Sequence, residues 1–146
     1  MRLPRPTAAK LGVAVTAGAV GALVNEVAIW VVKALGLKPG TGGLARLVFG
    51  VHLGTLEALA FHFFMGIAMA VAYVVLVRDF LRGPGWLRGL IFAQIPGILQ
   101  LFWVLPALGH GIGGWQISAV TPLLAWSLNA LYGIVMGWVA ELLPAS

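Results

Sequence analysis

The sequence predicts an all-α integral membrane protein, a four-helix bundle that takes up the whole chain. Hydrophobic residues make up 61% of the 146 residues and charged residues 9%, whereas soluble domains carry about 25% charged residues. The apolar residues gather into four runs, each close to the roughly 20 residues that a helix needs to cross the hydrocarbon layer. We therefore expect residues 1–146 to form a single transmembrane domain with no soluble part.

Glycine and proline mark the ends of the four predicted helices. Gly36 ends the first helix, and Gly83-Pro84-Gly85 separates the second from the third. Pro96 is expected to kink the third helix, because it removes a backbone hydrogen bond. Thr121-Pro122 suits the start of the fourth, with Thr as the cap and Pro in the first turn. The expected helices span about 11–35, 54–77, 86–108 and 121–143.

The segment just before the second helix is also apolar. One straight helix over residues 44–81 would be about 57 Å long, which is longer than a bilayer requires. We therefore predict a break near Gly50 or Gly54. Residues 44–53 would then form a short interfacial helix or dip into the membrane.

The distribution of Lys and Arg predicts the orientation of the bundle. Positively charged residues favour the cytoplasmic side of a membrane, and with four crossings the side that holds both termini carries more of them. We therefore expect both termini in the cytoplasm. That side holds Arg2, Arg5, Lys10, Arg78, Arg82 and Arg88, and the other side holds Lys33, Lys38 and Arg46.

The second and fourth helices share a pattern of residues. Each half of the chain would then be a helical hairpin, and the two hairpins would be parallel, related by an axis along the membrane normal. Chance matching among small apolar residues is the other explanation. The matching sets, with identical spacing, are His62, Gly66, Met69 and Ala70 in the first half and Asn129, Gly133, Met136 and Gly137 in the second.

One polar residue in each helix falls at nearly the same depth, which predicts a buried polar layer. Glu26, His62, Gln100 and Asn129 each lie about eight or nine residues from the outer end of their helix, or about 12–14 Å deep at 1.5 Å per residue. A charged group at this depth costs about 3 kcal/mol, so Glu26 should face inward and pair with His62. The amides of the other two helices would complete the hydrogen bonds.

The residues around this layer lie mainly on one face of the second predicted helix and one face of the fourth. We expect these two faces to support the polar layer. Gly66 and the Gly133-x-x-x-Gly137 pair allow close backbone approach, so we expect the second and fourth helices to pack together. His62 and methionine on one face raise the possibility of haem or copper ligation, but one helix cannot supply both axial ligands of a haem. The supporting residues are Asn25, Met65, Met69, Tyr73, Tyr132 and Met136.

The sequence contains no motif that indicates an enzyme. The absence of cysteine excludes disulfides and thiolate metal or redox sites. No phosphate-binding loop or dinucleotide fingerprint lies between a strand and a helix, and no serine lies in a nucleophile elbow. We expect no catalysis, no cofactor, no metal and no nucleic acid partner; lipid headgroups account for the net charge of +5. The expected partners are the lipid bilayer and either further copies of the chain or another membrane subunit.

The order of several features resembles the YagU-type bacterial inner-membrane proteins, a family of unknown function linked to acid tolerance. These features are Glu26 followed by Trp30, His52, the run that begins with His62, Tyr73, the pair Trp86 and Gly89, a Gln in the third helix, and the polar and aromatic fourth helix. The resemblance implies a multi-pass protein of the bacterial inner membrane. The family pattern leads us to expect a His on the last helix, where this chain has Asn129, which weakens any proton-relay role carried over from a pair of histidines.

Three functional hypotheses follow. The polar layer either transports or senses protons or a small solute, or it only holds the helices of a structural or accessory subunit in register. The third hypothesis is a redox subunit that binds haem or a quinone.

Overall fold

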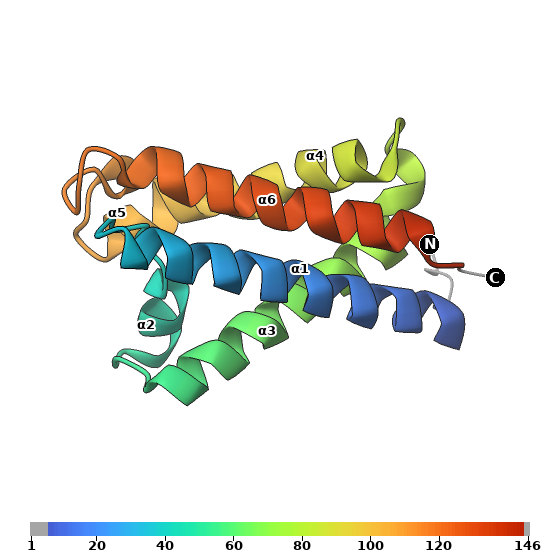
Figure 1. Ribbon diagram of the computed structural model, residues 1–146, viewed down its shortest axis with the longest axis horizontal. Helices are drawn as coiled ribbons and strands as arrows, with labels where there is room; N and C mark the ends of the chain where they lie inside the picture. The colour runs from blue at the N-terminus through green and yellow to red at the C-terminus, as the bar shows by residue number, and fades with distance from the viewer. Residues whose placement is uncertain (1–5, 145–146) are drawn as a thin grey trace.

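The computed structural model describes residues 6–144, and all of its regular elements are helices. Four helical segments are long and apolar enough to cross a membrane, over residues 8–34, 55–80, 85–107 and 121–142. The predicted all-α class with four long apolar helices is confirmed. Figure 1 shows them running between two ends. The end of the bundle where α1 begins and α6 ends is called the terminal end. The opposite end, which holds α2 and α5, is called the loop end.

The helix boundaries lie within a few residues of the predicted ones. Two of the four spans change helix type along their length, since π-helical turns follow α3 and α4. The elements are α1 (Ala8–Ala34), α2 (Gly43–Phe49), α3 (Thr55–Ala72) with a π-helix (Tyr73–Val77) and a 3₁₀ turn (Arg78–Phe80), α4 (Gly85–Leu99) with a π-helix (Gln100–Val104), α5 (Leu105–Ala107), a 3₁₀ turn (Ile112–Gly114) and α6 (Thr121–Leu142).

Two local predictions concern a break near Gly50 or Gly54 and a kink at Pro96. The break near Gly50 is present, because Gly50 ends α2 in the left-handed conformation (φ +69°), where it donates to the Arg46 carbonyl at 2.8 Å. Pro96 lies inside α4, which continues as a helix to Leu99, and the kink expected at this residue stays a prediction. The π-helix comes later, directly before Pro106, where its wider turn gives room to a second proline ring.

The start of α6 also differs from the prediction. Thr121 is the first residue of the helix rather than its cap. Its hydroxyl donates to the carbonyl of Lys38 at 2.7 Å and bonds to the Ser118 hydroxyl. The Thr121 side chain thus ties the loop that follows α1 to the loop that precedes α6, a distant contact that the local sequence pattern does not show.

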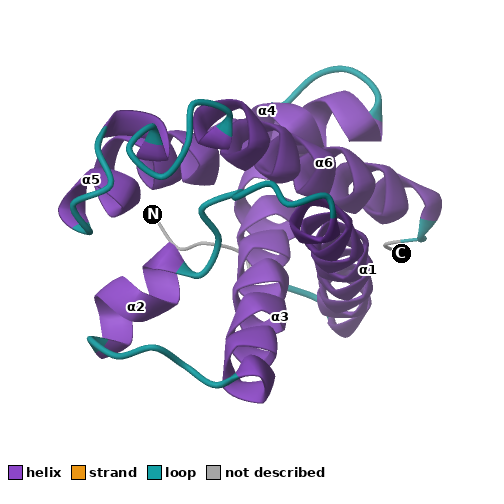
Figure 2. Ribbon diagram, turned by 60° about the vertical axis from the view of Figure 1, so that its left-hand side comes forward, coloured by secondary structure: helices purple, strands orange, loops and turns teal. Residues whose placement is uncertain are grey.

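Three helix pairs make up the bundle: α1 with α3, α4 with α6, and α1 with α6. Figure 1 shows α6 running alongside α1, whereas α3 crosses α1 obliquely. Figure 2 shows α4 and α6 together on one side and α2 and α3 on the other. The elements therefore form two hairpins, α1–α3 and α4–α6, that join along α1 and α6.

The glycines of the predicted packing faces lie in these contacts, but not between the helices we expected. Gly66 lies against Gly18 and Ala22 of α1, while Gly133 and Gly137 lie against Gly89 of α4. The expected direct packing of the second and fourth spans is therefore not present. The α3 backbone meets α6 chiefly through Tyr132, whose hydroxyl donates to the Gly66 carbonyl at 2.5 Å.

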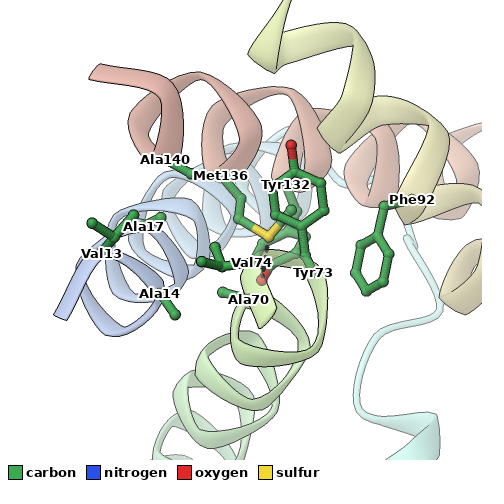
Figure 3. Packing of buried hydrophobic residues seen from close by; sticks show 10 residues of the cluster. All are labelled: Val13, Ala14, Ala17, Ala70, Tyr73, Val74, Phe92, Tyr132, Met136 and Ala140. Carbon is green, nitrogen blue, oxygen red and sulfur yellow. Dashed lines mark hydrogen bonds between the residues drawn. The ribbon is translucent and has the colours of Figure 1, made fainter. Parts of the chain in front are cut away.

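A buried apolar cluster holds the terminal end of the bundle together. Tyr73 and Met136 are fully buried there, so these two predicted members of the supporting faces belong to the core. Figure 3 shows the Tyr132 ring beside Met136, and the Tyr132 hydroxyl lies 3.3 Å from the Met136 sulfur. The cluster contains Val13, Ala14, Ala17, Ala70, Tyr73, Val74, Phe92, Tyr132, Met136 and Ala140.

Candidate functional site

The structure brings Glu26 and His62 together. Glu26 lies on α1 and His62 on α3, and the close approach of these helices at Gly18 and Gly66 sets the two side chains face to face. The Glu26 Oε2 atom lies 2.5 Å from His62 Nδ1. Both side chains are largely shielded, with 17% of the Glu26 side chain and 27% of the His62 side chain exposed. An acid and a base in such close contact can share or exchange a proton.

Asn25 makes the second contact to the His62 ring. Its Nδ2 atom lies 3.5 Å from His62 Nε2. With this arrangement, Nδ1–H donates to the carboxylate and Nε2 accepts from the amide, which corresponds to a neutral imidazole. Asn25 is 9% exposed, and its buried Oδ1 atom has no hydrogen-bond partner among the described residues. Asn25, which we expected only as a supporting residue, is thus part of the site.

Gln100 and Asn129 do not complete this hydrogen-bond network. Gln100 Nε2 donates to the carbonyl of Gly40 at 3.2 Å, in the loop after α1. Asn129 Nδ2 donates to the carbonyl of Ala125 one turn earlier in its own helix, at 3.0 Å. The local carbonyl satisfies the Asn129 amide without a partner from another helix. The predicted layer is therefore split into one acid–base pair and two separate amides.

All four residues of the layer nevertheless line a single cavity of about 790 Å³. Its walls are mainly apolar, and Met65 and Met69 continue the His62 face along α3. This volume is typical of pockets that bind drug-sized molecules, in which a few polar groups stand among apolar and aromatic ones. Apart from the pair, the polar or charged lining side chains include Asn25, Lys33, Gln100, Asn129 and Tyr132.

The cavity opens between α3 and α4, which are not a packed pair. Ala68 of α3 and Ile95 and Leu99 of α4 both line the cavity and are exposed on the surface of the bundle. Near the terminal end this gap is closed, because the rings of Tyr73 and Phe92 meet with centroids 5.4 Å apart. In a bilayer, the opening would face the lipid chains.

Sequence reasoning missed the aromatic side chains that line the cavity. Trp30 and Trp103 lie one turn from Glu26 and Gln100, so the spacing of aromatic and polar residues three or four apart could have placed them on the same face. The role of Glu141 was not predicted either. Its carboxylate accepts from the first backbone N–H of α4 at Gly85 (2.8 Å) and from Arg88 (3.2 Å), which holds the terminal end of the second hairpin.

The next feature is the set of side chains around His62 that could bind a metal ion. Between residues 6 and 144, no three side chains of His, Cys, Asp or Glu lie close enough together to hold a metal ion. His62 therefore has Glu26 as its acidic neighbour but no further ligand of these types beside it. Met65 and Met69, on the same face of α3 as His62, line the cavity.

Four apolar helices of spanning length, arranged around an internal acid–base pair, define a membrane protein with a cavity inside its helical bundle. No family model, curated protein or solved structure matches the chain. The resemblance to the YagU-type proteins thus stays a prediction.

Proposed function

We propose that this membrane protein transports or senses a small solute by taking up and releasing a proton at the Glu26–His62 pair. The single observation that supports this most strongly is that the pair lines a cavity of about 790 Å³. A buried carboxylate is costly in a membrane, and such groups commonly mark proton or solute pathways. Here the carboxylate is accessible to whatever occupies the cavity.

The split of the polar layer argues against a purely structural role. Polar residues that hold helices in register satisfy one another across the interface. Gln100 and Asn129 instead bond to backbone carbonyls, and the Asn25 oxygen has no partner among the described residues. The helices are held together by glycine contacts elsewhere, so Glu26 and His62 are not needed to set the register.

We further propose that the protein resides in the bacterial inner membrane with both termini in the cytoplasm. The excess of Lys and Arg on the terminal side supports this orientation. The gap between α3 and α4 leaves the cavity open on one side. A second copy or another membrane subunit is therefore our expected partner, and we propose no catalytic activity.

Infrared difference spectroscopy of the protein in liposomes tests the proton step. On acidification, we expect the wild-type difference spectrum to contain a component from the pair, as loss of a carboxylate band or protonation of an imidazole, and we expect Glu26→Gln to remove that component while the signals of the other carboxylates remain. Glu57→Gln is the matched control, because Glu57 is exposed in the first turn of α3 and does not line the cavity. Identical difference spectra for the wild type and Glu26→Gln, with both proteins folded, would contradict the proposal.

A further inference from the structure

The cavity has an unbalanced negative charge when His62 is neutral. The titratable side chains that line it are Glu26, Lys33, His62 and Tyr132. The Tyr132 hydroxyl is engaged by the Gly66 carbonyl. Lys33 is exposed and lies two turns beyond Glu26, about 10 Å along α1, where solvent and salt screen its charge. The deep part of the cavity therefore favours a positively charged occupant.

The walls of the cavity favour apolar groups on that occupant. Most of the lining side chains are apolar, and several are aromatic. The face of an aromatic ring attracts a cation that lies within about 6 Å, most strongly where water is excluded. The aromatic side chains of the lining are Trp30, Phe61, Phe92, Trp103 and Tyr132.

The opening of the cavity offers such a molecule a route from the bilayer. Ala68, Ile95 and Leu99 form its exposed apolar rim between α3 and α4. A cation with apolar substituents partitions into the membrane, whereas a small hydrated ion does not. The lining also reaches Lys33 and Thr41 at the loop end, so the cavity connects the lipid-facing rim with the aqueous side.

Asn25 shows how the same site would hold a proton instead. Its unpaired Oδ1 atom is on the same amide as the Nδ2 atom beside His62 Nε2. A half-turn of the amide would place the oxygen there, as an acceptor for the Nε2–H of an imidazolium. A protonated His62 would then donate to Glu26 and to Asn25, and the charge of the pair would be neutralised without a ligand.

From these observations we propose that the cavity binds an organic cation with apolar substituents and that this cation and a proton on His62 exclude each other. The proposal rests on the proton step described above and names its solute. When the cation binds to the protonated site, His62 loses its Nε2 proton to water, so one proton is released for each cation bound. The Glu26 carboxylate stays ionised and becomes the counter-ion of the ligand.

Equilibrium dialysis of the purified protein in detergent tests this with tetraphenylphosphonium as the probe. Tetraphenylborate, which has the same shape and the opposite charge, is the matched ligand, and protein-free detergent gives the background. We expect saturable binding of the cation only. Glu26→Gln should weaken it by about tenfold or more, and Glu57→Gln should bind like the wild type. Acidification should weaken binding to the wild type.

Proton release from the wild-type protein provides a readout that needs no variant. In weakly buffered acidic solution, addition of tetraphenylphosphonium should release protons in proportion to the cation bound. The proposal is overturned by equal binding of tetraphenylborate, by absence of saturable cation binding, by unchanged affinity in folded Glu26→Gln, or by cation binding without proton release. If the infrared signal of the pair is present while the cation does not bind, the proton step stands and only the nature of the solute is wrong.

Discussion

Each hairpin of this protein pairs two long helices at glycines, but the two hairpins differ in how closely the helices approach. A Cβ atom added at Gly133 would lie 2.5 Å from the carbonyl oxygen of Gly89, whereas one added at Gly66 would lie 3.4 Å from that of Gly18. Contacts below about 3.0 Å require something to shift. The α1–α3 hairpin is also close at Gly18, where an added Cβ would lie 2.7 Å from the Cα of Ile67, but the α4–α6 hairpin is closer still, since a Cβ added at Gly89 would lie 2.0 Å from the carbonyl oxygen of Gly133.

The two hairpins also differ in the polar residue that lies one turn before this glycine. One turn before Gly66 lies His62, which faces Glu26 of α1. One turn before Gly133 lies Asn129, and the residue that faces it on α4 is Gly97, where an added Cβ would lie 3.6 Å from the Asn129 Cβ. Equivalent positions therefore hold an acid–base pair in one hairpin and a glycine with an amide in the other. We propose that the more closely packed α4–α6 hairpin serves as the scaffold and that the α1–α3 hairpin carries the acid–base chemistry.

Gly133→Ala should have the largest effect on stability. Its methyl group would meet the Gly89 backbone, which cannot move without separating α4 from α6. We expect a loss of about 3 kcal/mol or more in the free energy of unfolding, measured by denaturant titration in detergent with circular dichroism. Gly12→Ala is the control, since an added Cβ there has no neighbour within 4 Å. It should leave stability unchanged or raise it by up to about 1 kcal/mol.

Gly66→Ala, at the equivalent position of the α1–α3 hairpin, should cost less stability than Gly133→Ala. Its methyl group would lie 2.9 Å from the side chain of Ala22 and at ordinary contact distance from backbone and Tyr132. We expect a loss of about 1 kcal/mol in the same titration. A loss as large as that of Gly133→Ala would show that the two hairpins are packed equally closely and would remove the contrast between them.

Tyr132→Phe should have a smaller effect still, because it removes one hydrogen bond that joins the hairpins. The lost bond runs from the Tyr132 hydroxyl to the Gly66 carbonyl, and we expect a cost of about 0.5–1 kcal/mol. Tyr73→Phe is the matched control, since the buried Tyr73 hydroxyl has no hydrogen-bond partner among the described residues. Its loss should be neutral or stabilising. Equal destabilisation by both variants would count against a link through Tyr132.

The sequence was sufficient to predict the spans and the meeting of Glu26 with His62. Hydrophobic length sets the spans, and the cost of an isolated charge brings the two ionisable side chains together. The partners of Gln100 and Asn129 could not be predicted in this way. Helical periodicity gives the face on which a side chain lies, but not which helix lies opposite it, nor whether a nearby carbonyl satisfies it first.

Helical periodicity does not show which helices lie opposite one another, and this also explains why the glycine contacts were assigned to the wrong helix pairs and why the cavity was not predicted. Gly66 and Gly133 were correctly read as small residues on a face, but each lies against the other helix of its own hairpin. The cavity arises because α3 and α4 are not paired. A gap between two apolar helices leaves no pattern in either of them, so only the assembled bundle reveals it.

Thiol accessibility at neighbouring positions of α3 tests the central claim most directly, and the chain has no cysteine of its own. Met65 lines the cavity, whereas Phe64, at nearly the same depth, is 66% exposed on the surface of the bundle. In liposomes, a positively charged methanethiosulfonate reagent should modify Met65→Cys, and it should leave Phe64→Cys unmodified because a thiolate does not form in lipid. Modification of Phe64→Cys alone, or of neither variant, would contradict an accessible cavity enclosed by four membrane-spanning helices.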